Sequence, residues 1–204
     1  MKKGTKIGLI VLGIFILFVF ITYRTLVGTY NELVRMEEEV KNAWAQVQNQ
    51  YQRRADLIPN LVETVKGYAA HERETLEAVI NARARATQVQ VDPARLLENP
   101  QLMQQFAQAQ GQLSSALSRL MVVIERYPDL KANQNFIALQ TQLEGTENRI
   151  AVERRRFNEA VRNYNQKLRQ FPTVLIANMF GFREKAYFEA AAEAQQAPKV
   201  DFSQ

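Results

Sequence analysis

Hydrophobic residues open the chain in one unbroken run. The seventeen residues from Ile7 to Tyr23 carry no charged side chain and are mostly Ile, Leu, Val and Phe. Coiled as a helix, they extend for about 26 Å, close to the ~30 Å hydrocarbon core of a bilayer. The pattern therefore predicts one membrane-spanning helix.

A cleaved signal peptide is the alternative for this segment. Such a peptide has an apolar region of about 7–15 residues that ends at small residues of the Ala-x-Ala kind. Here the run is longer, and the stretch from Thr22 to Tyr30 offers no such site. We therefore expect an uncleaved signal-anchor, so that residues 1–28 form a short cytoplasmic stub and a transmembrane helix.

Beyond the span, apolar residues recur every three or four positions, which is the spacing of a helix with one apolar face. No segment alternates in the manner of a strand, and four such stripes follow one another up to Gln170. The pattern predicts an all-α protein in which the transmembrane helix leads into an antiparallel four-helix bundle of long helices. Five aromatic residues in register with the stripes are expected in its core: Trp44, Tyr51, Tyr68, Phe157 and Tyr164.

Prolines and capping residues suggest where these helices end. The residue before Pro59 is biased away from helical geometry, and Asp56 is a candidate N-cap, so we expect a turn or kink between Tyr51 and Asp56. A second helix should then run from Asp56 to about Ala86.

The third and fourth helices have clearer boundaries. Asn99 and Pro100 have the order of an N-cap and a first helical residue, and start the third helix. The fourth should run from about Leu130 to Gln170, where Phe171–Pro172 stops it.

The segment 173–188 is too apolar for a free tail. Packing against one end of the bundle, as a short C-terminal helical segment, is the favoured interpretation. The alternative is that Phe180 and Phe182 are presented to a partner or to the membrane surface. Residues 29–188 would then form the bundle domain, and residues 189–204 a flexible tail.

Net charge separates the N-terminus from the rest of the chain. The chain carries +5, of which Lys2, Lys3, Lys6 and Arg24 supply +4, and the remaining residues balance 22 basic against 21 acidic side chains. The domain is therefore not basic, and we expect no nucleic acid as a partner. Because lysines precede the span, the bundle is expected outside the cytoplasm, on the periplasmic or extracellular face of the cell membrane.

Catalytic chemistry has few residues to draw on. The chain has no cysteine and one histidine, His71, which excludes a disulfide, a thiolate nucleophile and a multi-histidine metal site. His71 stands in the sequence HERETL, which lacks the proline of a histidine-kinase phosphoacceptor box and the second histidine of a zinc protease. We expect no enzyme activity, no cofactor and no bound metal.

Three consecutive arginines, Arg154, Arg155 and Arg156, form a candidate interface for an acidic partner. Pairing with glutamates such as Glu153 and Glu159 on the same helix is the favoured alternative.

Three blocks of sequence resemble a known family. They are YNELV (Tyr30–Val34), the stretch from Ala43 to Glu72, and the stretch from Tyr164 to Phe182. In these blocks the chain resembles the LemA family of bacterial membrane-anchored proteins. The resemblance implies a single membrane helix followed by a four-helix bundle, and association with other membrane or envelope proteins. It implies no biochemical activity.

Two functions remain open. The first is a non-enzymatic scaffold or adaptor, anchored in the membrane, that presents its bundle to partner proteins in the cell envelope. The second is a self-assembling structural protein, because long helices on a tether are able to form a homo-oligomer. An enzyme is disfavoured by the lack of paired titratable residues.

Overall fold

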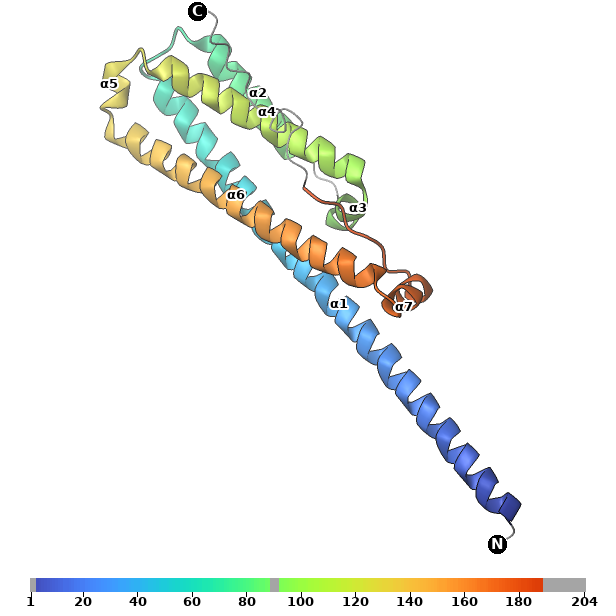
Figure 1. The fold of residues 1–204 in the computed structure, drawn as a ribbon. Helices are drawn as coiled ribbons and strands as arrows, with labels where there is room; N and C mark the ends of the chain where they lie inside the picture. Colours follow the sequence, from blue (N-terminus) through green and yellow to red (C-terminus); the bar gives the residue numbers. More distant parts are fainter. Residues whose placement is uncertain (1–2, 89–91, 189–204) are drawn as a thin grey trace, which may run out of the picture.

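The computed structural model describes residues 3–88 and 92–188, with side chains from Ile10 onward within those ranges. All regular structure in these ranges is helical (Figure 1). The helices in chain order are α1 (Lys3–Lys66), α2 (Arg73–Gln88), α3 (Pro93–Glu98), α4 (Pro100–Ile124), α5 (Pro128–Lys131), α6 (Gln134–Arg169) and α7 (Thr173–Phe180). The predicted all-α class is confirmed.

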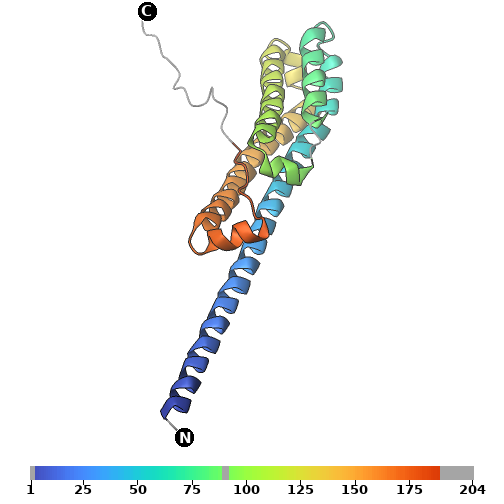
Figure 2. The ribbon, with the colours of Figure 1, turned by 90° about the vertical axis from the view of Figure 1, so that its right-hand side faces the viewer.

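Helix α1 is the long axis of the molecule. Its 64 residues span about 96 Å at the rise of an α-helix. The N-terminal part extends away from every other helix (Figures 1 and 2), and its large apolar side chains from Ile10 to Ile21 are 50–66% exposed. By length and composition this segment is able to cross a bilayer. The boundary expected at residue 28 falls inside α1, and the tail expected at 189–204 lies outside the described residues.

The bundle is made from the C-terminal half of α1 together with α2, α4 and α6. Helix α1 packs along α6, and α2 packs along α4 (Figure 1). Contacts between α1 and α2 join the two pairs. The chain reverses between successive long helices, so the antiparallel arrangement and the short helix after it agree with the sequence prediction.

The predicted core aromatics are buried with one exception. Trp44, Tyr51, Phe157 and Tyr164 lie in one cluster and are at most 7% exposed. Tyr68 is 47% exposed, so its assignment to the core was wrong. Helix α1 has already ended at Lys66, so Tyr68 lies in the turn toward α2 and its hydroxyl accepts a hydrogen bond from Asn133.

The expected turn between Tyr51 and Asp56 is absent, because α1 continues without interruption to Lys66 and contains Pro59. Proline lacks an N–H, which leaves the carbonyl oxygen of Ala55, four residues earlier, without its helical donor. Arg83 of α2 supplies that donor at 2.7 Å. Asp56 caps no helix, and its carboxylate accepts a hydrogen bond from Gln52 instead. The expected second helix is therefore divided between α1 and α2.

The other helix ends agree better with the sequence. Asn99 caps α4 through hydrogen bonds to its carboxamide oxygen from the backbone N–H groups of Gln101 and Leu102. Helix α6 begins four residues later than expected, because Pro128 starts the separate helix α5 and Asn133 caps α6. Helix α6 ends at Arg169, before Phe171 and Pro172, as predicted.

After α7, Gly181 lets the chain turn back toward the bundle. Its φ of 78° lies in the left-handed region, which glycine adopts without the steric cost of a side chain. The following residues, up to Phe188, form no helix or strand and run back along α6 (Figure 1).

Candidate docking cleft

A cleft of about 1260 Å³ lies on the bundle, lined by residues of α1, α2, α4 and α6. Polar side chains of α4, such as Gln108, Ser114 and Ser115, line it from one helix. Glu147 and Arg154 line it from α6. The chain segment 184–187 also lines the cleft, so part of the groove is already occupied by a non-helical stretch of the same chain.

Two asparagines of α6 hold this stretch by its backbone. The side chain of Asn165 accepts a hydrogen bond from the N–H of Lys185 and donates one to its carbonyl oxygen, both at 2.9 Å. Asn158 makes the same pair of bonds with Phe188, both at 2.8 Å. The two asparagines are seven residues apart, so they lie on the same face of α6. A carboxamide paired with a peptide group recognises an extended backbone whatever its side chains.

Two acidic side chains, from α1 and α3, hold the side chain of Lys185. Its side chain is almost wholly buried, and its ammonium group forms ion pairs with Glu37 at 2.7 Å and with Glu98 at 2.8 Å. The Lys185 nitrogen also lies 5.8 Å from the ring centre of Tyr164. Burial, followed by the two glutamate charges, raises the pKa of the Tyr164 hydroxyl above its usual range. Since both of its acidic partners are present, the buried lysine is compensated.

Phe188 closes the docked stretch within an aromatic cluster. Its ring centre lies 6.2 to 6.5 Å from those of Trp44, Tyr51 and Phe106, and the guanidinium of Arg154 lies 3.9 Å from its centre. Burial raises the pKa of the Tyr51 hydroxyl to about 12. The stretch is thus fixed by backbone hydrogen bonds, one buried ion-pair group and one aromatic anchor.

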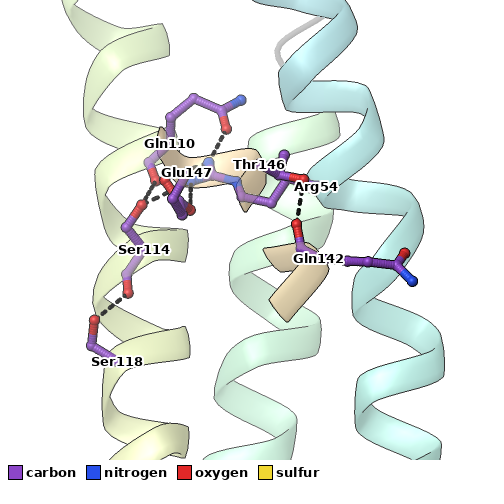
Figure 3. Close-up of polar contacts among 7 residues, drawn as sticks. All are labelled: Arg54, Gln110, Ser114, Ser118, Gln142, Thr146 and Glu147. Atoms are coloured by element: carbon purple, nitrogen blue, oxygen red, sulfur yellow. Dashed lines mark hydrogen bonds and ion pairs between the residues drawn. The ribbon is translucent and has the colours of Figure 1, made fainter. Parts of the chain in front are cut away.

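Arg54 is a buried charged residue that also lines the cleft. It extends from α1 toward α4 (Figure 3) and is 1% exposed. Its guanidinium donates hydrogen bonds to Ser114 at 2.8 Å, to the side chain of Gln110 at 2.6 Å and to the carboxylate of Glu147 at 2.5 Å. Gln110 in turn donates to the backbone carbonyl of Ala86 in α2. One arginine therefore links all four long helices.

Sequence reasoning missed Arg54, Lys185 and the two asparagines. A signal for Arg54 was present, since it falls between Tyr51 and Ile58 at the spacing of the buried stripe of α1. A charged residue in an apolar stripe needs a buried partner. Asn158 and Asn165 carry no comparable signal, because polar residues on a long helix are ordinarily solvated.

The predicted interface residues lie on two different elements. Arg154 packs on Phe188, whereas Arg155 and Arg156 are exposed and Arg156 pairs with Glu153, as the favoured alternative had it. Phe180 and Phe182 instead flank the ring of Tyr30 at 4.9 and 5.6 Å. A partner for either set stays a prediction.

Metal chemistry finds no support in the part of the chain that the structure describes. His71 is exposed in the turn between α1 and α2, and no three acidic or histidine side chains of the described residues converge on a common point.

These features define a class of protein in which an exposed apolar helix continues without a break into a helical bundle. The LemA family model matches residues 43–202, and the chain belongs to the LemA family. It is 28% identical over 177 residues to Protein LemA of Metamycoplasma hominis, covering 87% of this chain and 76% of that protein. It is also 28% identical over 203 residues to the magnetosome protein MamQ of Magnetospirillum gryphiswaldense, covering 92% and 74%. A further relative is magnetosome protein MamQ 2 of Paramagnetospirillum magneticum, at 27% identity over 202 residues, with 92% and 74% covered.

Proposed function

We propose that this protein is a membrane-anchored, non-enzymatic adaptor whose cleft docks extended segments of partner proteins. Anchorage is supported by the exposed apolar segment of α1, which would be unstable in water and is long enough to cross a bilayer. Neither the family description nor the names of the relatives states a catalytic activity. The lysines that precede the span favour a bundle on the outer side of the cell membrane.

Helix α1 couples anchor and bundle mechanically. From Tyr23 to Lys66 it rises by about 65 Å without a linker. The bundle on such a helix keeps a defined distance from the bilayer. This property suits a scaffold, because a partner in the same membrane would meet the cleft at a fixed height.

The docked stretch 185–188 is the observation that carries the proposal. It shows that this groove accepts an extended backbone, through paired hydrogen bonds from Asn158 and Asn165. The remaining groove is lined by groups of the same kind, including the amide side chains of Gln104, Gln108 and Gln112. Main-chain recognition of this sort binds peptides without requiring one side-chain sequence.

Arg85 and Arg119 suggest the charge of the partner. Both line the cleft, and neither forms an ion pair with any residue that the structure describes. The acidic residues that line the cleft are, by contrast, already paired: Glu98 with Lys185, Glu147 with Arg54 and Glu184 with Arg169. We therefore expect the docked segment of the partner to carry acidic side chains.

Site-specific photo-crosslinking in cells tests this proposal. A photoreactive amino acid is placed at Gln112 or Ser115, which are exposed in the cleft, and at Gln46, an exposed position on α1 that does not line it. The cleft positions should yield discrete crosslinks to other envelope proteins, and these should weaken in an Arg85→Glu, Arg119→Glu chain. Equal crosslinks from Gln46, or crosslinks only to other copies of the chain, would contradict an adaptor, and the latter would favour the self-assembling alternative.

A further inference from the structure

Helix α7 places an apolar surface beside α1 near Tyr30, where the exposed N-terminal part of that helix meets the bundle (Figure 1). It packs against α1 and α6 through its inner face, where Thr173, Ile176 and Ala177 are buried. Its outer face carries Leu175 and Met179, which are one helical turn apart and 61% and 62% exposed. The helix has no charged residue.

Two phenylalanines extend this outer surface. Phe171, just before the helix, is 81% exposed, and Phe180 at its end is 50% exposed. Soluble surfaces seldom leave so many large apolar side chains together in water. The bundle core does not need them, because Ile176 and Ala177 already complete the packing on that side. Something outside the bundle should therefore shield this apolar surface from water.

The position of α7 along α1 indicates what shields this surface. Phe180 contacts Tyr30, with ring centres 4.9 Å apart, and Tyr30 follows the apolar run by seven residues. A bilayer core of ~30 Å accommodates about 20 helical residues. Counted from Ile7, the core then ends near Leu26, so the contact with α7 lies only about 6 Å beyond it, at the depth of the lipid headgroups.

Charged residues around α7 fit that depth. Arg169 and Arg183, which precede and follow α7 in the chain, are exposed, and Arg169 lies 3.7 Å from Glu184. Arginine at the edge of a span is attracted to anionic headgroups while its stem covers apolar surface. An apolar helix between such residues has the composition of a segment that lies in the membrane interface.

We infer that α7 is a membrane-interface helix, whose outer face of Phe171, Leu175, Met179 and Phe180 inserts into the lipid boundary beside the anchor. The inference rests on the proposed anchorage of α1. The helix is a second point of attachment, several residues wide and fixed to both α1 and α6. Together with the span it limits the tilt and rotation of the bundle, and so sets the direction in which the cleft faces.

Spin labels on the full chain test this inference, and the absence of native cysteine makes each label unique. Met179→Cys and Leu175→Cys report on α7, Val19→Cys on the span, and Val122→Cys, 71% exposed at the far end of α4, on water. The labelled chains are reconstituted in vesicles of phosphatidylcholine and phosphatidylglycerol. Collisions with oxygen, which concentrates in lipid, and with a water-soluble nickel complex are then measured.

The labels at 175 and 179 should lose most of the nickel accessibility seen at 122, and gain oxygen accessibility toward the value at 19. Accessibilities at 175 and 179 like those at 122, together with a label at 19 that nickel does not reach and oxygen does, would overturn the inference and leave the anchor intact. A water-accessible label at 19 would overturn the anchorage itself. Labels at 175 and 179 shielded from both reagents would show a protein cover, such as a second copy, and would also overturn the inference.

A charge variant supplies an independent readout. Leu175→Asp with Met179→Asp changes exposed positions, so the thermal unfolding of the bundle in detergent should stay close to that of a Val122→Asp control. In vesicles, the double variant should increase the mobility of a label at position 122, because the bundle loses its second attachment. Unchanged mobility would contradict the inference.

Discussion

Arg83 of α2 donates a hydrogen bond to the backbone carbonyl of Ala55 in α1, with 2.7 Å between the Nε atom and the oxygen. That carbonyl is the one that Pro59 leaves without an intrahelical donor. The contact lets α1 continue through a proline as one helix, from its exposed apolar segment to the far end of the bundle. It also ties α2 to α1 at that point.

Replacing Arg83 should therefore destabilise the bundle. In Arg83→Met the part-buried Ala55 oxygen loses its donor, and the free energy of unfolding should fall by about 1–3 kcal/mol. Denaturant unfolding of the full chain in detergent measures this change. Arg85→Met, which removes an exposed arginine two residues farther along α2, should shift it by less than about 0.5 kcal/mol.

The double variant makes the explanation specific. In a Pro59→Ala background the chain has an N–H at position 59 that is able to bond to Ala55. Arg83→Met should then cost less than it does in the native chain. Equal costs in the two backgrounds would show that Arg83 acts through some contact other than the Ala55 carbonyl.

Glu147→Ala should be costly as well. The substitution leaves the guanidinium of Arg54, 1% exposed, without its anionic partner. Breaking a fully buried ion pair costs about 3–5 kcal/mol, and the loss here should be nearer 2 kcal/mol because the Glu147 side chain is 40% exposed. Glu144→Ala, one turn earlier on α6 and exposed, is the matched control. Similar unfolding curves for the two variants would refute the role of Glu147.

Asn165→Ala should release the docked segment. It removes both bonds to Lys185 and leaves a buried peptide group unpaired, at a cost of about 1–3 kcal/mol. Hydrogen exchange followed by mass spectrometry should show faster exchange in residues 182–188 than in the native chain. Asn163→Ala, at an exposed position on the same helix, should leave that exchange unchanged. Protection that persists in Asn165→Ala would assign the docking to other contacts.

Alkaline pH should weaken the fold through Tyr51. Burial raises the pKa of its hydroxyl from 10.0 to about 12 in the folded chain. The unfolded chain therefore loses the proton first, so the stabilisation is complete below pH 10 and is lost as the pH rises toward 12. Between these values the free energy of unfolding should fall more steeply for the native chain than for Tyr51→Phe. A Tyr187→Phe control, with an exposed tyrosine, should keep the native slope; identical slopes for all three would contradict the assignment to Tyr51.

Local patterns in the sequence predicted the exposed apolar helix, the helical class and several helix ends. Each of these features depends on neighbouring residues alone. The uncharged run from Ile7 to Tyr23 lies in a helix long and apolar enough to cross a bilayer, and the three-to-four spacing of the stripes and the cap at Asn99 are found as expected. The same patterns placed Trp44 in the core, because burial on a helix follows from its register. They assigned Tyr68 wrongly, because a register holds only while the helix continues.

Tertiary contacts decided what sequence neighbours do not control. Taken alone, Pro59 predicts an interruption of the helix, because it removes the backbone donor for the Ala55 carbonyl oxygen. Only Arg83, 28 residues from Ala55 along the chain, supplies that missing donor. The cleft depends on still longer separations, since Arg54 meets Ser114 and Glu147 at 60 and 93 residues along the chain. Asn165 likewise gains its function only when the chain turns back at Gly181 and brings Lys185 beside it. Hydrogen bonds across such separations form only once the helices have packed, which is why the sequence predicted the bundle and the folded structure alone showed the groove.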